Sequence, residues 1–487
     1  MACGEFRQHL STHEKDSASF AQFPVRSGNV NWGIQRTRGP MKNALGFPAR
    51  TYLVVFSVAV ASILAGLLWG VQSEDPIMVW SAAGVGALAY FGYLLKSAHN
   101  PLTAAIALMW LVILEPAPCD ILAGLGALAW FVHCAAIKRV PVGLSFSEAL
   151  LVLFALVNGV TILLGPKPPS EVDMVRHVSI TAYLVLFSVI VSRVAGSLDS
   201  LRRVLGIYLI PCVITSCVLI LGLCFEKLHV DFFGLKDVIV LEMRPRGFFK
   251  DPNVAGPSLI LGGLYCLTKI VYGEGKQSRM YAVLLALFFV GILLTFSRGA
   301  LFSFVIGIFC VLVMSGRFFS ARVFGRVIAA LVLGAAVLWY VVSVDNVTGR
   351  IVDGTYGVDD RMKRIEYGLE NMSDNILIGV GMMLDPDKAP HDSYFFILVQ
   401  SGIVGFVLLW GPLFYISLHL VRMSRMDRSS GEKALLLALA GCMVAHLLIG
   451  TVVYILHWRH FWLLVGMSVA ALRGLDRGSA DVQGIPK

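Results

Sequence analysis

Charged residues are scarce in this chain. They make up 15% of its 487 residues, whereas 57% of the sequence is hydrophobic. In soluble globular domains, charged residues make up about a quarter of the sequence. The composition of this chain therefore excludes that class. The hydrophobic residues gather in runs of about 20, the length at which a helix crosses a hydrocarbon core of ~30 Å. The predicted fold class is therefore all-α, a polytopic integral membrane protein.

Several common signatures are also missing. The chain has no Walker loop, no paired-histidine zinc helix and no internal repeat. Residues 1–50 lack the apolar core of a cleavable signal peptide, so we expect a disordered cytoplasmic arm there and insertion directed by the first hydrophobic helix. The nine cysteines are odd in number and have no metal-like spacing. We expect no disulfide framework, metal site, cofactor or nucleic-acid partner, and interpret seven cysteines as small buried hydrophobes: Cys134, Cys212, Cys217, Cys224, Cys266, Cys310 and Cys442.

Hydropathy predicts about fourteen membrane spans. The segment 101–115 is short, and a re-entrant pair formed with 120–137 would lower the count to twelve. Either number is even, which leaves both termini on one side of the membrane. The predicted spans are 52–72, 76–96, 101–115, 120–137, 143–165, 178–196, 203–224, 253–272, 281–297, 299–315, 327–345, 394–420, 434–456 and 458–473.

Basic residues in the short loops predict the orientation. Lys138-Arg139, Arg202-Arg203 and the arginines at 422, 425 and 428 fall on one side, together with the N-terminal arm. The positive-inside rule makes that side the cytoplasm. The predicted organisation is a cytoplasmic arm (1–50), amino-terminal helices (51–200), a transmembrane core (201–473) and a cytoplasmic tail (474–487).

Two predicted external loops are unusually basic. Ten lysines and arginines lie in 225–253 and 346–393, on the side where the rule disfavours positive charge. An anionic ligand at the outer leaflet is one explanation. The other is that long loops cross the membrane whatever their charge, and loop charge alone does not choose between the two.

The first of these loops ends in a polar cluster, Arg244–Asn253. Pro245 and Gly247 force a turn around Arg246, and the following Asp-Pro-Asn sequence is typical of a helix cap. Arg246 is thereby held near a helix start. The alternative is a capped helix with basic residues that snorkel to the interface, an interpretation that suits Lys250 best.

Two further polar groups are expected on the same face. Arg298 lies in a tight turn between two apolar runs, where an arginine is costly unless it is paired or at the water interface. His391 follows a proline at the start of a long apolar span, and a neutral imidazole is a common proton acceptor for a hydroxyl. Snorkelling for Arg298 and a structural role for His391 are the alternatives. Arg361 belongs to a stretch that continues to about residue 373 and is predicted to form an amphipathic helix.

Weaker candidates have simpler explanations. Asp385 and Asp387 resemble a metal-binding pair, but acids spaced in this way are common in loops. Asp75 lies in an external loop of only a few residues, which favours a turn. Glu148 and Asn158 are expected to be helix-packing contacts within the fifth span.

Taken together, these motifs resemble the O-antigen ligase and polymerase superfamily of bacterial membrane glycosyltransferases. The similarity covers roughly residues 200–420, and its order, spacing and predicted external placement all fit. The matching segments are Arg246–Asn253, Phe296–Ala300, Asn375–Gly381, Pro390–Tyr394 and Gly402–Gly405.

The resemblance implies transfer of a glycan from undecaprenyl diphosphate to a sugar hydroxyl, without nucleotide sugar or metal. It places the enzyme in the bacterial inner membrane with the site facing the periplasm or exterior. We expect Arg246 and Arg298 to stabilise the leaving diphosphate and His391 to deprotonate the acceptor for inverting attack. Predicted substrate-binding residues are Arg244, Lys250, Asn253, Arg361 and Tyr394.

The expected partners are the lipid-linked glycan donor, a glycan or lipid-linked acceptor, membrane lipid and envelope-assembly proteins. A polysaccharide polymerase is slightly favoured over an O-antigen ligase. Two alternatives stay open. A transporter or lipid flippase for an anion would hold its substrate near the midplane. A polyprenyl-monophosphate-sugar transferase would use Asp75 instead of Arg298 and His391.

Overall fold

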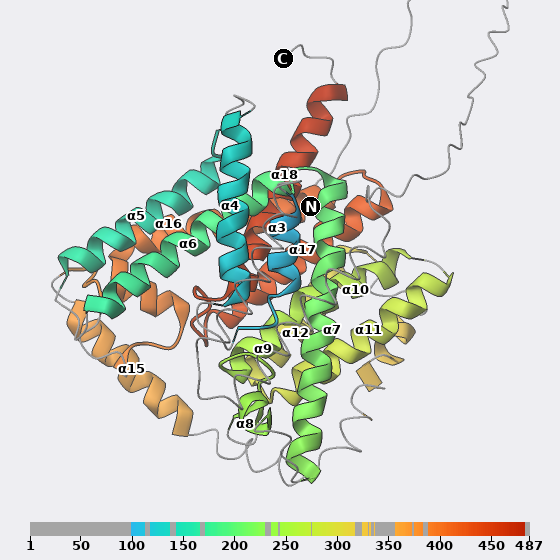
Figure 1. Cartoon of the computed structure of the whole chain (residues 1–487), viewed down its shortest axis with the longest axis horizontal. Coiled ribbons are helices and arrows are strands. Elements are labelled where there is room, and N and C mark those ends of the chain that lie inside the picture. Colours follow the sequence, from blue (N-terminus) through green and yellow to red (C-terminus); the bar gives the residue numbers. More distant parts are fainter. Residues whose placement is uncertain are drawn as a thin grey trace, which may run out of the picture. The chain divides into compact units, whose positions relative to one another are not determined.

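The structure is a computed structural model (Figure 1). It describes residues 99–112, 117–136, 143–165, 171–228, 235–241, 244–273, 275–316, 324–329, 331–332, 336, 356–372, 375–382 and 388–482. The N-terminal arm, the predicted spans 52–72 and 76–96, most of the predicted span 327–345, and Asp75, Asp385 and Asp387 lie outside the described residues.

Helices dominate the described part of the chain. Seven of them are long and apolar enough to cross a membrane by length and composition, which confirms the predicted all-α polytopic membrane fold. The longer helices are α3 (His99–Ala107), α4 (Pro118–Ala136), α5 (Phe146–Leu164), α6 (Glu171–Val194), α7 (Leu198–Leu228), α10 (Ile260–Tyr272), α11 (Gly275–Leu294), α12 (Arg298–Met314), α15 (Tyr356–Met372), α16 (Ser393–Ser424), α17 (Ser430–Ile449) and α18 (Arg459–Val482). The shorter elements are α8 (Leu235–Ile239), β1 (Val240–Leu241), β2 (Arg244–Pro245) and α9 (Pro252–Ser258).

Two predicted spans have the wrong limits, and a third, 253–272, has nearly the expected limits but is divided into two helices. The helix expected over 101–115 ends at Ala107, and the Val112 amide donates to the Phe248 carbonyl instead. The span expected over 253–272 consists of α9 and α10, because Pro257 lacks the amide proton that a continuous helix needs. The span expected to reach 456 ends at Ile449, because the loop that follows is bonded to Ser393 at the start of α16.

Helix α10 lies at the centre of the packing. It contacts α7, α9, α11, α12 and α17, and residues 260–268 are all buried. This part of α10 is therefore enclosed by protein and does not face lipid. By contrast, α5 exposes a continuous apolar stripe, which indicates a lipid-facing surface: Leu153, Leu156, Val160, Leu163 and Leu164.

Helix α16 is interrupted at Gly402, whose φ is 62°. The segment 375–382 supplies hydrogen bonds at this break. Val380 N donates to Val399 O at 2.9 Å, and Val404 N donates to Leu377 O at 3.1 Å. A broken membrane helix is stable where another segment satisfies its backbone groups. The break thus fixes the chain between α15 and α16.

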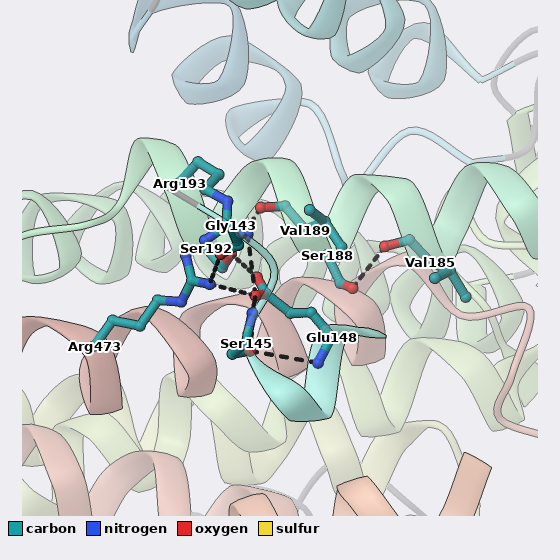
Figure 2. Close-up of polar contacts among 9 residues, drawn as sticks. All are labelled: Gly143, Ser145, Glu148, Val185, Ser188, Val189, Ser192, Arg193 and Arg473. Atoms are coloured by element: carbon teal, nitrogen blue, oxygen red, sulfur yellow. Dashed lines mark hydrogen bonds and ion pairs between the residues drawn. The ribbon is translucent and has the colours of Figure 1, made fainter. Parts of the chain in front are cut away.

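Glu148 and Asn158, the two polar residues predicted to be packing contacts in the fifth span, have different partners. Those of Glu148 come from α6 and α18. Glu148 Oε2 accepts from Arg193 Nη2 at 3.1 Å and from Arg473 Nη2 at 2.6 Å, and Ser192 donates to Oε1 (Figure 2). These bonds join α5, α6 and α18. Both carboxylate oxygens of a buried glutamate are therefore occupied, as a charge held away from water requires.

Candidate functional site

A cavity of about 690 Å³ brings together four of the eight residues predicted to form the site. They are Lys250, Asn253, Arg361 and His391. Its other walls come from the segment 109–112 after α3, from α4, α6, α7 and α9, and from the loop between α17 and α18 with the start of α18. The size and the mixture of apolar and polar lining are typical of a small-molecule site.

Arg246 does not line this cavity. Its Nε donates to Val238 O at 3.0 Å, Nη2 donates to Asp237 O at 3.0 Å, and Nη1 donates to Lys250 O at 3.3 Å. The guanidinium therefore connects α8 to Lys250 through backbone carbonyls. This arrangement positions Lys250 at the cavity.

Arg244 joins the first polar cluster to the turn before α12. Its Nη2 donates to Asn253 Oδ1 at 3.1 Å and to Thr295 O at 3.0 Å, and its Nε donates to the same carbonyl at 3.2 Å. Two motifs far apart in the sequence are thus in direct contact. In the described structure Arg244 supports the cavity wall, and it is not among the lining residues.

Arg298 is exposed at the first residue of α12 and lies outside the cavity lining. The preceding turn contains Phe296 with φ of 52°, a conformation that costs energy for a bulky side chain. The next residue, Gly299, packs against Val452, since a Cβ built there would lie 3.3 Å from the valine side chain. Val452 lines the cavity. Arg298 therefore directly precedes Gly299, the residue that contacts the cavity wall.

His391 is exposed to the cavity immediately before α16. The next residue, Asp392, caps the helix by accepting from Phe395 N at 2.7 Å. Burial raises the pKa of Asp392, although backbone donors and Arg361 oppose this shift. Ser393 is bonded to Val453 O at 2.9 Å and to Ile455 N at 2.8 Å. His391 is therefore held at a rigid junction between α16 and the loop before α18.

Tyr394 is a packing residue in this structure. Its ring stacks on Trp410 with centroids 4.0 Å apart, and its hydroxyl donates to Leu447 O at 2.9 Å. It does not line the cavity. The side chain helps fix the start of α16, which carries His391.

Sequence reasoning missed several polar groups of the cavity. Asp120 and Arg459 form a two-point ion pair, in which Arg459 Nε donates to Asp120 Oδ1 at 2.5 Å. Arg176 and His177 line the cavity from α6, and His457 lines it from the loop before α18. Their positions inside predicted spans, where charge is costly, were the signal that could have marked residues 120 and 459 individually.

His457 is exposed where it lines the cavity. The surrounding protein lowers the pKa of His457, and the charges of Arg459 and Lys250 contribute to the shift. The imidazole is therefore neutral at neutral pH and can both donate and accept hydrogen bonds.

A second cavity of about 550 Å³ lies between α5, α15 and the segment 375–382. Its lining includes Leu156, Val160, Leu164 and Val404, all of which are also exposed at the outer surface. This cavity therefore opens toward the lipid-facing side. Across the described ranges, no group of three or more histidine, cysteine or acidic residues is arranged to hold a metal.

One segment of the chain matches a known family. Residues 283–410 match the O-antigen ligase family. The match confirms the predicted resemblance to the O-antigen ligase and polymerase superfamily. None of the curated proteins compared with this chain matches it. The O-antigen ligase segment contains Arg298, Arg361, His391 and Tyr394, whereas the cluster at 244–253 lies before it.

Proposed function

We propose that this chain is a membrane glycosyltransferase that moves a glycan from undecaprenyl diphosphate to a sugar hydroxyl. The observation that carries the proposal is the meeting of His391 with Lys250 and Arg361 in one cavity. The O-antigen ligase match supports an enzyme of this general type. A polysaccharide polymerase remains slightly favoured over an O-antigen ligase.

The proposed reaction is a direct displacement at the anomeric carbon. The acceptor hydroxyl oxygen forms the new bond to that carbon while the bond to the diphosphate oxygen breaks. His391 takes the hydroxyl proton, and undecaprenyl diphosphate leaves with the electron pair. A single displacement inverts the anomeric configuration.

Negative charge builds up on the leaving diphosphate, so the site needs fixed positive charge there. Lys250 and Arg361 are already at the cavity, and Arg298 can approach from its edge. These cations would do the work of a divalent metal, so the proposed reaction is metal-independent. Arg246 contributes mainly by holding the Lys250 loop through its three carbonyl contacts.

The lipid part of the donor needs an apolar path. The second cavity supports one, because its apolar lining continues onto the exposed face of α5. We propose that the first isoprene units lie there while the diphosphate occupies the larger cavity. Arg361 and Tyr367 lie on the same helix and line the larger and the second cavity respectively.

This reaction belongs at the outer face of the bacterial inner membrane, with both chain termini in the cytoplasm. Its partners would be the lipid-linked donor, a glycan or lipid-linked acceptor, and envelope-assembly proteins. A transporter of the same lipid would bind the diphosphate with these cations but leave the anomeric bond intact.

Lysine substitutions at the two predicted arginines test the assignment. Arg298→Lys should lower transfer by purified protein roughly a hundredfold, nearly as much as Arg298→Ala, because lysine lacks the planar fork that binds two phosphate oxygens. Thermal stability should not change, since Arg298 is exposed. Arg246→Lys should lower stability and transfer together, because it removes the backbone contacts of the guanidinium.

The assay uses donor lipid extracted from a strain that lacks this chain. If Arg298 only snorkels to the membrane interface, Arg298→Lys should transfer the glycan at nearly the normal rate, because lysine reaches lipid headgroups equally well. Near-normal transfer by Arg298→Lys would therefore remove Arg298 from the site.

A further inference from the structure

One wall of the cavity contains the imidazole of His177, which is bonded to the buried amide of Gln400. A second buried amide, Asn158, holds Gln400 in turn. Gln400 Nε2 donates to Asn158 Oδ1 at 2.6 Å and lies 3.2 Å from His177 Nε2. Ser401 also donates to Asn158 Oδ1, at 2.8 Å. Because the Gln400 amide nitrogen is a donor, His177 Nε2 is the acceptor, and the ring carries its proton on Nδ1.

Neither Asn158 nor Gln400 is among the lining residues, and both are almost fully buried. Buried amides in an apolar helix bundle are costly unless their hydrogen bonds have a structural or functional purpose. Here they fix the tautomer and orientation of one cavity histidine.

A second hydrogen-bonded set orients the neighbouring polar groups. Asp120 accepts from Arg459 through two bonds and from the Tyr183 hydroxyl at 3.1 Å. Asp120, Tyr183 and Arg459 all line the cavity. His457 stacks on Tyr454 with ring centroids 5.3 Å apart, and both face the same space.

This wall suits a sugar better than a phosphate. The Asp120 carboxylate would repel an anion, whereas a carboxylate, a guanidinium and neutral imidazoles can bind adjacent hydroxyls. The ring of Tyr454 offers an apolar face of the kind that packs against the C–H face of a pyranose. The cavity volume of about 690 Å³ lies in the range of small-molecule sites and leaves room for a sugar beside a diphosphate.

We propose that His177, His457, Tyr454 and the Asp120–Arg459 pair form a carbohydrate subsite for the glycan of the lipid-linked substrate. This inference rests on the proposed function. The subsite binds the sugar next to the diphosphate and determines which glycan is accepted. All five residues lie outside the segment 283–410, so substrate choice is set by the part of the chain beyond the O-antigen ligase match.

The test compares two lipids that differ only in the glycan. The first is undecaprenyl diphosphate, and the second is the glycan-bearing lipid extracted from cells that lack this chain. Binding of each to the purified full chain is measured for wild type, His177→Phe and His457→Phe. His419→Phe is the control, because it makes the same change on α16 at a position outside the cavity lining.

Wild type should bind the glycan-bearing lipid more tightly. Each cavity variant should lose roughly three- to tenfold of that affinity, since one or two hydrogen bonds are removed, while affinity for undecaprenyl diphosphate is retained. Gln400→Leu should match His177→Phe, because it frees the ring that Gln400 holds.

Two results would overturn the subsite itself. Equal weakening of both lipids would assign this wall to the diphosphate, and unchanged binding of both would remove it from recognition. Failure of wild type to bind either lipid would instead refute the proposed function on which the subsite rests.

Discussion

Four arginines in the described part of the chain have a role set by their immediate partners. Arg246 donates to backbone carbonyls, Arg459 pairs with Asp120, and Arg193 and Arg473 share Glu148. A charge that leaves water is tolerated only with such partners. Residue type alone therefore does not separate an arginine that binds substrate from one that stabilises the fold.

Glu148 is the clearest stabilising residue. Its side chain is 2% exposed and paired with two arginines. Glu148→Ala should lower the free energy of unfolding by roughly 3–5 kcal/mol, because both arginines would remain buried without their counter-charge. The measurement is thermal or denaturant unfolding of the detergent-solubilised protein.

Asp199→Ala provides the matched control. Asp199 also pairs with an arginine, at 2.8 Å, but its side chain is 80% exposed. An exposed pair contributes ~1 kcal/mol at most, so stability should barely change. Equal effects of the two substitutions would contradict the structural role assigned to Glu148.

At the scale of elements, the break in α16 links the helix bundle to the site. Gly402 adopts positive φ, and a methyl group there would overlap the Leu377 carbonyl. The segment 375–382 docks at this point, and two residues before the break Gln400 reaches His177. The break is thus a local departure from helix geometry that positions a cavity side chain.

Gly402→Ala should disturb this docking. The expected result is faster amide hydrogen exchange in 375–382 and lower transfer activity, with the rest of the bundle intact. Gly411→Ala is the control, because it lies in the same helix and its Cβ would meet no atom within 4 Å. That change should be neutral or slightly stabilising. Unaltered exchange in Gly402→Ala would show that the segment does not depend on the glycine.

Hydropathy predicted most described helices because membrane spans need long apolar runs. It failed where tertiary contacts end a helix, as at Ile449, where the following loop binds Ser393. Four predicted site residues reach the cavity. The sequence could not reveal that Asp120 pairs with Arg459, which is 339 residues away, or that backbone carbonyls occupy the guanidinium of Arg246.

At the scale of the whole described molecule, stabilising and candidate catalytic polar groups are at opposite ends of α6. His177 and Arg193 are sixteen residues apart, which is roughly 24 Å along a helix. The Glu148 cluster occupies one end, and the cavity with its cations and histidines occupies the other. If the cavity lies at one membrane face, as we propose, and not at the midplane, that position favours an enzyme over an alternating-access transporter.

The central claim is that this cavity cleaves and transfers a lipid-linked glycan. In the direct measurement, the purified chain in lipid nanodiscs receives the glycan-bearing lipid and an acceptor glycan. The two products, undecaprenyl diphosphate and the glycosylated acceptor, are then quantified. Wild type should release undecaprenyl diphosphate in step with glycan transfer. His391→Ala should still bind the donor but transfer roughly a hundredfold more slowly or worse, whereas His419→Ala should behave as wild type. Intact donor after incubation with wild type, or full transfer by His391→Ala, would contradict the account.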